Sequence, residues 1–542
     1  MPQLNVHIKH AGKTHDVVLD TDRPPVVFKD AIYQVTGVPP ERMKVMIKGG
    51  MLKDETDWKK VAPKEGQTFM VIGAAGELPK PPDNPIVFLE DMDESQLAQA
   101  VAYPVGLVNL GNTCYMNSTV QALRAIPELQ TALAQSPPPG LPTQLSNLYR
   151  TMSSTIDGVT PQGFLMALRQ AFPQFAEQIP SGNKILGNAE ECWVQLLGSL
   201  RDVPGIPGPS GGAPGRFVDQ YLTGTMRREL TCDEAPEEPP SVTSEKVLKV
   251  ECNISINTNY MQTGIMDALD GKIEKNSPSL GREAVYTSKS RLSRLPSYLT
   301  VHMVRFAWRR DISKKAKIMR KVKFPTEFDA LDLVTDDLKE KLIPISRKLK
   351  ELEKERSERL KVRKRTKVAQ ASASTDKGKG KDGDVEMADA AEPSTVAGTS
   401  SAAAAGPSTV EGEGEKKVES VELEEETVYR ERELAELEKL VHPEIKADVG
   451  ASVSGFYELV AIVTHKGAAA DAGHYMGFVK RSVFHPVSRS PTEPGLPEDD
   501  EDWYKFDDDK VSILPRGKLM TLDGGGEDSS AYVLLYRTKP LA

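Results

Sequence analysis

One interior stretch limits what this chain can fold into. Between Thr366 and Ser420 there is no Leu, Ile, Phe, Trp or Tyr, and Ala, Ser, Gly, Thr and Glu fill most positions. Such a segment cannot bury enough apolar surface to offset the entropy that ordering it would cost. We therefore expect a disordered insertion that interrupts the folded part of the chain.

Charge changes sign across the same stretch. Residues 346–381 hold 14 Lys and Arg against 5 Asp and Glu, whereas residues 382–426 hold 2 Lys against 13 Asp and Glu. Leucines spaced among the charged residues on both sides predict a helix on each flank: Leu349, Leu352, Leu360, Leu434, Leu437 and Leu440. Two interpretations remain open. The helices form a solvated charged hairpin or arms around the insertion, which we favour, or they form a specific docking element.

Length and composition set wider bounds. A chain of 542 residues allows about three domains. Four Cys argue against a disulfide scaffold and fit a reducing compartment, and a net charge of −9 argues against a nucleic-acid partner. No run of 18 apolar residues occurs and the N-terminus does not look like a signal peptide, so we expect no membrane association.

The N-terminal 75 residues have the pattern of a β-grasp fold. Alternation and helical spacing predict strand, strand, helix, strand and strand, at residues 4–8, 16–19, 28–36, 43–47 and 68–72. With Gly37–Arg42 and Lys48–Asp54 at corresponding positions, residues 1–75 resemble ubiquitin.

The resemblance has one informative departure. Ubiquitin ends in a free Gly-Gly, but this chain continues through Gly73–Glu77, so the module is expected to bind ubiquitin receptors and not to be conjugated as a tag. Met46 and Ile72 fall where ubiquitin has its apolar recognition patch; the alternative is that they are core or scattered surface residues. Four prolines between Leu78 and Ile86 predict an extended spacer within residues 76–100.

Cys114 is the strongest candidate nucleophile. Gly and Asn form a tight turn just before it, and apolar residues at Met116, Val120 and Leu123 predict a helix from Cys114 onward. Unpaired N–H groups at a helix N-terminus favour a thiolate, the reactive form of cysteine. The other three Cys have no such setting and are expected to be inert, as buried small hydrophobes: Cys192, Cys232 and Cys252.

His474 is the best candidate base among eight His. Residues 473–479 place it where a loop with a preceding glycine enters a strand, so that its ring can project toward the sulfur. His302 lies in a core-like strand, and His465 ends the preceding strand and is expected to be structural. An orienting acid would come from one of three residues that follow Trp503–Phe506: Asp507, Asp508 and Asp509. Because successive side chains of a strand point to opposite faces, Asp508 lies on one face and the other two lie on the opposite face. This does not choose between Asp507 and Asp509.

These segments together resemble the ubiquitin-specific proteases, a family of papain-like deubiquitinases. The Cys segment 106–118, the His segment 473–479 and the run 503–511 carry the resemblance, and residues 294–299 agree with it. Further segments make the chain most similar to the proteasome-associated member that has an N-terminal ubiquitin-like domain: residues 88–92, 172–177, 191–193 and 217–220.

The resemblance implies an α+β fold, in which an N-terminal β-grasp ubiquitin-like domain precedes a papain-like catalytic domain over residues 101–540, interrupted by a disordered insertion at 346–426. It implies that Cys114 is the nucleophile, His474 the base and Asp507 the orienting acid, and that Asn109 donates to the oxyanion. No cofactor is implied. The implied partners are ubiquitin, ubiquitinated proteins and, through the ubiquitin-like domain, the proteasome regulatory particle, which implies a cytoplasmic and nuclear location.

Three departures from the family pattern qualify these expectations. Many relatives carry paired Cys-x-x-Cys zinc ligands, whereas Cys232 and Cys252 stand singly, which argues against a metal site. Residues 186–189 replace a usual Gln-Gln-Asp-Ala by Leu-Gly-Asn-Ala, which puts substrate-groove contacts there in doubt. The loop 466–473 holds Ala where hydroxyl residues could be phosphorylated, which argues against that form of control.

Two other functions remain open. The chain could be a proteasome-binding regulator whose catalysis is dispensable or lost, although the intact Cys114, His474 and Asp507 argue against lost catalysis. It could also be a protease for another ubiquitin-like modifier.

Overall fold

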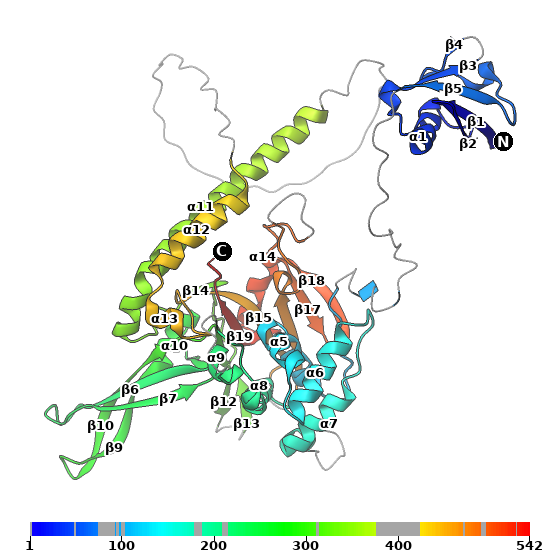
Figure 1. The fold of residues 1–542 in the computed structure, drawn as a ribbon. Coiled ribbons are helices and arrows are strands. Elements are labelled where there is room, and N and C mark those ends of the chain that lie inside the picture. The colour runs from blue at the N-terminus through cyan, green and yellow to red at the C-terminus, as the bar shows by residue number, and fades with distance from the viewer. Residues whose placement is uncertain are drawn as a thin grey trace, which may run out of the picture. The chain divides into compact units, whose positions relative to one another are not determined.

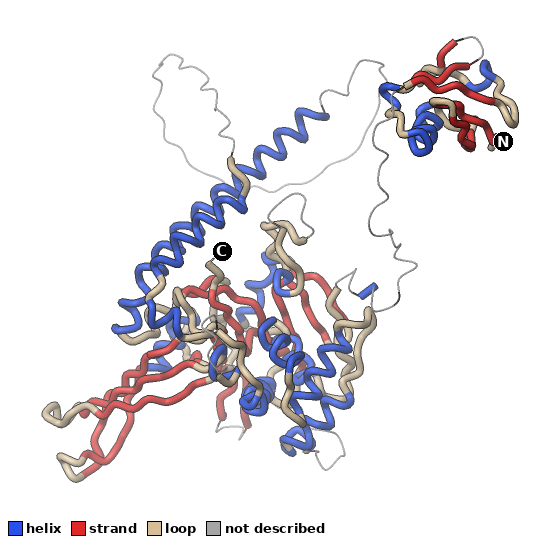
Figure 2. Tube along the Cα trace, in the orientation of Figure 1, coloured by secondary structure: helices blue, strands red, loops and turns tan. Residues whose placement is uncertain are grey.

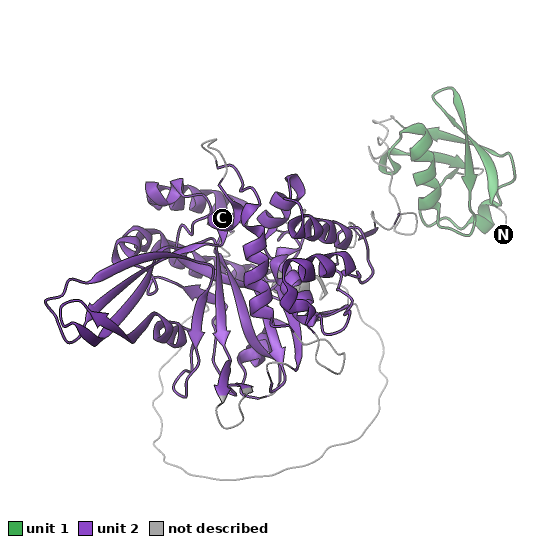
Figure 3. Cartoon of the chain, turned by 90° about the horizontal axis from the view of Figure 1, so that it is seen from below, with its two compact units in different colours: residues 1–92 green, residues 93–542 purple. Residues whose placement is uncertain are grey.

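The chain forms two compact units, residues 1–92 and 93–542 (Figure 3). The computed structural model describes residues 3–47, 50–73, 93, 97–98, 103–177, 187–208, 215–309, 314–375, 423–469, 472–488, 495–526 and 528–541. Most of the expected spacer at 76–100 and the 376–422 part of the expected insertion lie outside these residues.

The first unit is a five-stranded sheet with one long helix; the four predicted strands and the helix are present, and the short strand β4 is added. The sheet has the order β2-β1-β5-β3-β4, and its central pair, β1 and β5, is parallel. The elements are β1 (Leu4–His10), β2 (Lys13–Leu19), α1 (Pro25–Thr36), β3 (Lys44–Ile47), β4 (Gly50–Met51), α2 (Trp58–Val61) and β5 (Thr68–Ile72). This is the β-grasp order of a ubiquitin-like domain.

Helix α1 ends where the sequence predicts, because of a single glycine. Gly37 has a φ of 69°, in the left-handed region that glycine adopts without strain, and its N–H donates to the Tyr33 carbonyl at 2.8 Å. Phe28 and Ile32 on the inner face of the helix are buried against the sheet, where Phe69 of β5 is also buried.

The second unit is built on an eight-stranded sheet covered by helices on one side (Figures 1 and 2). Seven strands have the order β18-β17-β16-β15-β19-β11-β8, and β14 pairs with β15. They are β8 (Val250–Asn253), β11 (Tyr298–Val304), β14 (Glu327–Asp329), β15 (Phe456–Lys466), β16 (His474–Lys480), β17 (Trp503–Asp507), β18 (Lys510–Leu514) and β19 (Ser530–Thr538).

The central strands β15, β16, β11 and β19 are buried on both faces, so they are nearly continuously apolar. Tyr475 and Val479 of β16 join one core with the N-terminal helices, whereas Met476 and Phe478 join another core on the opposite face. The helices of the first core are α4 (Cys114–Leu123), α5 (Pro127–Gln135), α6 (Leu141–Met152), α7 (Gln162–Ala171), α8 (Ala189–Ser199) and α9 (Phe217–Tyr221). The shorter helices α10 (Met261–Leu269), α13 (Pro443–Ala447) and α14 (Arg516–Leu519) complete the unit.

A second sheet of four strands extends away from the rest of this unit (Figure 1). Its order is β7-β6-β10-β9, from the strands β6 (Gly224–Cys232), β7 (Ser241–Val247), β9 (Asp270–Ser277) and β10 (Arg282–Arg294). A separate hairpin, β12 (Phe306–Arg309) and β13 (Lys314–Lys317), follows β11.

The flanks of the expected insertion are helices that pack together. Helix α11 (Asp336–Thr375) lies beside α12 (Glu426–Leu440) in Figure 1, and the two run antiparallel. Leu349, Leu352 and Leu437 are buried with Phe456 of β15. The two flanks thus form the hairpin of the favoured interpretation, but it is not fully solvated, because Leu349, Leu352 and Leu437 anchor it on the catalytic unit. Although α11 is long, no helix in the described part of the chain combines the length and the apolar character of a membrane span.

Candidate active site

Cys114 is the first residue of α4, as the sequence predicts. A left-handed turn at Gly111 and Asn112, with φ values of 92° and 55°, brings the chain to it. Thr113 occupies the N-cap position but makes no side-chain capping bond, so its hydroxyl does not occupy the first N–H groups of the helix. The side chain is 98% buried in the first core. The candidate nucleophile thus lies buried at the N-terminus of a helix.

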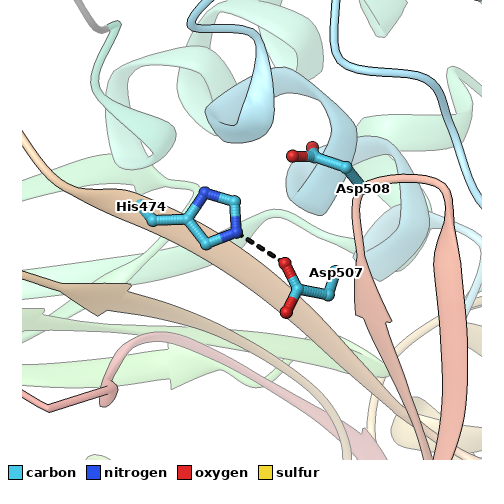
Figure 4. A group of neighbouring side chains, drawn as sticks. All are labelled: His474, Asp507 and Asp508. Atoms are coloured by element: carbon cyan, nitrogen blue, oxygen red, sulfur yellow. Dashed lines mark hydrogen bonds and ion pairs between the residues drawn. The ribbon is translucent and has the colours of Figure 1, made fainter.

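His474 is the first residue of β16 and lies beside the sulfur. The Tyr475 N–H, one residue further on, donates to Cys114 Sγ at 3.5 Å, which joins the strand to the nucleophile. The ring Nε2 of His474 lies 2.6 Å from Asp507 Oδ1 (Figure 4). A hydrogen bond with Cys114 and then the bond to Asp507 outweigh partial burial and raise the pKa of His474 to about 9. The imidazolium is therefore stabilised at neutral pH, between a sulfur and a carboxylate.

Asp507 is the acid that lies against His474. Burial by itself would raise the pKa of Asp507, but hydrogen bonds from His474 and Lys505 outweigh it and hold that pKa below its usual value. Asp509, the alternative that alternation leaves open, is exposed in the turn that joins β17 to β18. The structure thus brings together Cys114, His474 and Asp507, as the family resemblance implies.

Asn109 lies in the turn before Cys114 and is tied to the far end of the chain. Its Oδ1 accepts from the Gly111 N–H at 2.9 Å, and its Nδ2 donates to Asp508 Oδ2 at 2.9 Å. The other oxygen of Asp508 accepts from Asn117 Nδ2 at 2.8 Å. One carboxylate therefore holds both Asn109 and the helix that carries Cys114.

Asp508 has a role that sequence reasoning missed, because it was considered only as a candidate orienting acid. It has a φ of 54° in the turn after β17, and its carbonyl accepts from the Leu107 N–H at 2.9 Å. Gly106 lies so close that an added Cβ would stand 2.4 Å from the Asp509 carbonyl oxygen. The sequence signals were the three consecutive Asp residues and the glycine that opens the Cys segment. Neither signal shows that these two parts of the chain meet.

His474, Asp507 and Asp508 are the one group in the described part of the chain whose ligand atoms lie close enough to hold a metal ion, within 4.8 Å of one another (Figure 4). Each of these side chains already has a hydrogen-bond partner: His474 with Asp507, and Asp508 with Asn109 and Asn117. The arrangement thus fits an acid–base pair better than a ligand set.

The other candidate histidines lie in the core. His302 in β11 and His465 at the end of β15 are buried. His302 Nδ1 lies 4.0 Å from Glu251 Oε1, whereas the ring nitrogens of His465 have no hydrogen-bond partner among the described residues. Burial, with the nearby charges of Lys317 and His474, lowers the pKa of His465 to about 4. Its ring contacts Phe306 and Tyr475 edge-on, with centroids 5.1 and 4.8 Å away. His465 is a neutral packing residue, consistent with the structural role expected for it.

The remaining cysteines are buried, and all four Cys are free thiols. Burial is the main cause that raises the pKa of Cys192, and it raises that of Cys252 to about 12. Cys232 and Cys252 lie in separate apolar clusters. Their surroundings are those of inert core thiols.

The departure at residues 186–189 keeps the local structure of a helix start. Leu186 lies outside the described residues, but Asn188 caps α8 by accepting from the Glu190 and Glu191 N–H groups at 2.8 and 3.3 Å. An added Cβ at Gly187 would stand 2.7 Å from the ring of Tyr115, so a larger residue there would require the ring to move. The glycine and the ring are therefore fitted to each other.

The loop before His474 is partly held by the β12–β13 hairpin. Ala469 pairs with Ala316 of β13, and the Lys317 N–H donates to the Ala468 carbonyl at 3.0 Å. Lys317 Nζ also donates to the His465 carbonyl at 2.9 Å. Residues 470–471 lie outside the described residues. Residues 468 and 469 of this loop are thus bonded to a neighbouring strand.

Similarity to known proteins identifies the family. A family model described as ubiquitin carboxyl-terminal hydrolase matches residues 105–536. The chain belongs to this family. It is 38% identical to ubiquitin carboxyl-terminal hydrolase 6 of Schizosaccharomyces pombe, over 99% of this chain and all of that protein. It is 36% identical to ubiquitin carboxyl-terminal hydrolase 6 of Arabidopsis thaliana, over 98% of each chain. Ubiquitin carboxyl-terminal hydrolase 14 of Caenorhabditis elegans is 29% identical, over 99% of this chain and 94% of that protein.

The match to this family model confirms the family resemblance that the sequence motifs carry. The protein is a ubiquitin carboxyl-terminal hydrolase, a thiol-dependent deubiquitinase, and ubiquitin and ubiquitinated proteins are its substrates. Its α+β catalytic fold follows a ubiquitin-like domain, as expected.

Proposed function

We propose that Cys114, His474 and Asp507 perform this hydrolysis as nucleophile, base and orienting acid. The observation that carries the proposal is the pair of His474 and Asp507, 2.6 Å apart, beside a cysteine at an open helix N-terminus. Asp507 occupies Nε2 of the ring, so Nδ1 is the nitrogen left to exchange a proton with the sulfur.

The reaction then proceeds in two steps. The thiol proton passes to His474, and the sulfur attacks the carbonyl carbon of the ubiquitin C-terminal glycine. The tetrahedral intermediate collapses to a thioester as the imidazolium gives its proton to the departing lysine amine. Water, deprotonated by His474, attacks the thioester and releases the ubiquitin carboxylate and the free thiol.

The oxyanion of both steps would be held by Asn109 and the backbone N–H of Cys114. One N–H of the Asn109 amide is used by Asp508, which leaves the second for the substrate oxygen. A preorganised donor of this kind contributes about 3–4 kcal/mol of transition-state stabilisation. The bond to Asp508 supports that preorganisation, because it fixes the amide before substrate arrives.

The ubiquitin-like domain would dock the enzyme on a ubiquitin-receptor subunit of the proteasome regulatory particle. Its sheet exposes four apolar side chains on one face, Met46, Met51, Met70 and Ile72, each 43–53% exposed. Met46 pairs directly with Met70 and with Met51, so the four are neighbours. An apolar face of this kind on a small soluble domain is typical of a docking surface. It favours the patch over the alternative of core or scattered residues.

Such docking would concentrate the hydrolase on proteasome-bound conjugates, where it would recycle ubiquitin and regulate the proteasome. Its location would then be cytoplasmic and nuclear, with the proteasome.

The test is release of a fluorescent reporter from the ubiquitin C-terminus, with and without added proteasome. We expect activity that rises when proteasome is added, and Cys114→Ala should remove it. If Cys114→Ala retains the activity, the nucleophile is assigned wrongly. A thiol-reactive ubiquitin probe distinguishes an enzyme from a regulator without catalysis, and matched probes on other modifiers test the remaining alternative.

The docking face has its own test. Met70→Lys should remove the stimulation by proteasome and leave the basal activity unchanged, because it places a charge in the centre of the apolar face. Val26→Lys, at an exposed position on α1, is the matched control. Equal stimulation in both variants would contradict docking through this face.

A further inference from the structure

Lys505 lies on the same face of β17 as the orienting acid. Strand alternation buries Phe506 between Lys505 and Asp507 and turns both charged side chains toward the opposite side. Lys505 Nζ donates to Asp507 Oδ2 at 3.1 Å, while His474 uses Oδ1. The two oxygens of one carboxylate are thus divided between the imidazole and the ammonium group.

This division has two physical consequences. A carboxylate bonded through one oxygen can rotate about its terminal torsion, which is broad. A second bond to Oδ2 fixes the plane of the group and so the direction from Oδ1 to the ring. The ammonium charge also offsets part of the carboxylate charge that stabilises the imidazolium, so Lys505 limits how strongly His474 holds its proton.

We propose that Lys505 is a positioning residue for the hydrolysis, acting on His474 only through the second oxygen of Asp507. The proposal rests on the roles proposed above for His474 and Asp507. Lys505 would then follow Asp507 in the chain of bonded side chains that runs from Cys114 through His474.

The surroundings of His474 give the sign of the effect. Cys114 approaches the ring from α4 and His465 from β15, while Asp507 and Asp508 approach from β17 and the turn that follows it. His465 is neutral at the pH of the assay, and the sulfur of Cys114 and the carboxylate of Asp507 favour the protonated His474 ring. Lys505 is the cation bonded to this group, so its removal should make His474 hold its proton to higher pH.

The experiment compares Lys505→Met, Lys505→Arg and Lys518→Met in the full-length protein, by the pH profile of reporter hydrolysis. Lys518, exposed on α14, is the control for loss of one surface lysine. For Lys505→Met we expect kcat to fall about tenfold with KM unchanged, and the alkaline limb of kcat/KM to move up by about 0.5–1 pH unit. Lys505→Arg, which keeps a donor and the charge, should restore both values.

A double-mutant cycle tests whether the effect passes through Asp507. In an Asp507→Asn background, Lys505→Met should change neither the profile nor kcat further. Titration of the His474 ring by NMR gives the same comparison without turnover, so a slow variant still yields a result.

A wild-type profile and kcat for Lys505→Met would overturn the proposal, as would a raised KM alone, which would indicate substrate binding. So would a Lys505 effect that persists fully in the Asp507→Asn background. Failure of the proposed catalytic roles is recognised separately, because Cys114→Ala and Asp507→Asn would then retain wild-type activity.

Discussion

Two ionic networks of the catalytic unit use the same chemistry at different depths. In the active site, His474 and Asp507 are 34% and 36% exposed and are bonded in a short chain with Lys505. Between α11 and α12, Arg356 and Glu433 are 6% and 7% exposed, and Arg359 bridges Glu433 and Glu426 at 2.6 and 3.0 Å. In each network a carboxylate is shared between two cations: Asp507 between His474 and Lys505, and Glu433 between Arg356 and Arg359.

The difference in depth implies a difference in role. Half-exposed pairs cost little to open and contribute little stability, but they shift proton affinities. Pairs that are nearly fully buried are costly to break, because the partner left behind remains desolvated. The active-site network should therefore control activity, and the helix network should hold together two segments that are separated by the 376–422 stretch.

The largest effect is expected for Asp507→Asn. Loss of the carboxylate removes the support for the correct tautomer and for the imidazolium, so kcat/KM should fall by about 10³–10⁴-fold. The pKa of His474 should fall from about 9 toward its ordinary value of 6.5, because one of the causes that raise it is gone. The alkaline limb of kcat/KM then moves to lower pH, as a pH profile will show.

Asp509→Asn is the matched control for this variant, since it changes an exposed carboxylate two residues away. It should behave as the wild type. If Asp509→Asn lost activity while Asp507→Asn stayed active, Asp509 and not Asp507 would be the orienting acid. Melting temperatures of both variants should be close to that of the wild type.

Glu433→Ala should lower the stability of the helix pair and leave the activity nearly unchanged. It leaves Arg356 and Arg359 buried with one carboxylate fewer, at a cost of about 3 kcal/mol. Hydrogen exchange of α12 should speed up accordingly, while reporter hydrolysis below the melting temperature stays near the wild-type rate. Glu438→Ala, exposed on the same helix, should change neither quantity. Unchanged exchange in Glu433→Ala would mean that burial of these ions does not stabilise the helix pair.

Asp508→Ala tests the link between the two ends of the active site. It removes the acceptor for Asn109 and Asn117, so we expect kcat to fall about 10–100-fold with little change in KM. Asp509→Ala, which removes the next carboxylate of the same turn, should leave kcat unchanged. A pure rise in KM in Asp508→Ala would argue against a preorganised Asn109.

Local signals in the sequence predict much of the fold and the site. The turn before Cys114, the strand entry at His474 and the glycine that ends α1 are set by residues close in the chain. The choice between Asp507 and Asp509 was not predictable by alternation, because Asp508 adopts a φ of 54° and ends the strand pattern. The contact of Asp508 with Asn109, 399 residues away, depends on how the sheet docks against the Cys segment.

The same reason limits prediction of surfaces and helix contacts. Met46 and Ile72 were predicted from similarity to ubiquitin, but Met51 and Met70 join them through strand pairing that local sequence does not specify. The leucines of α11 and α12 predict helices, but which of them are buried depends on their contact with Phe456.

The smallest effect is expected where a polar group is buried without any partner. The ring of His465 is fully buried, neither of its nitrogens has a hydrogen-bond partner in the described part of the chain, and Gly473 fits closely against it. His465→Phe keeps the shape and the edge-on ring contacts, so the free energy of unfolding should change by less than about 1.5 kcal/mol. His465→Ala leaves a cavity and should cost about 3 kcal/mol.

Activity decides between packing and chemistry at this position. His465→Phe should keep kcat/KM within about threefold of the wild type, because the ring contributes shape to the wall behind His474 and no proton. A loss comparable to that of Asp507→Asn, in a protein that melts normally, would show that a neutral imidazole without a hydrogen-bond partner takes part in the reaction. The inference that a buried group contributes stability and not catalysis would then be wrong, because His465 is buried and has no ionic partner among the described residues.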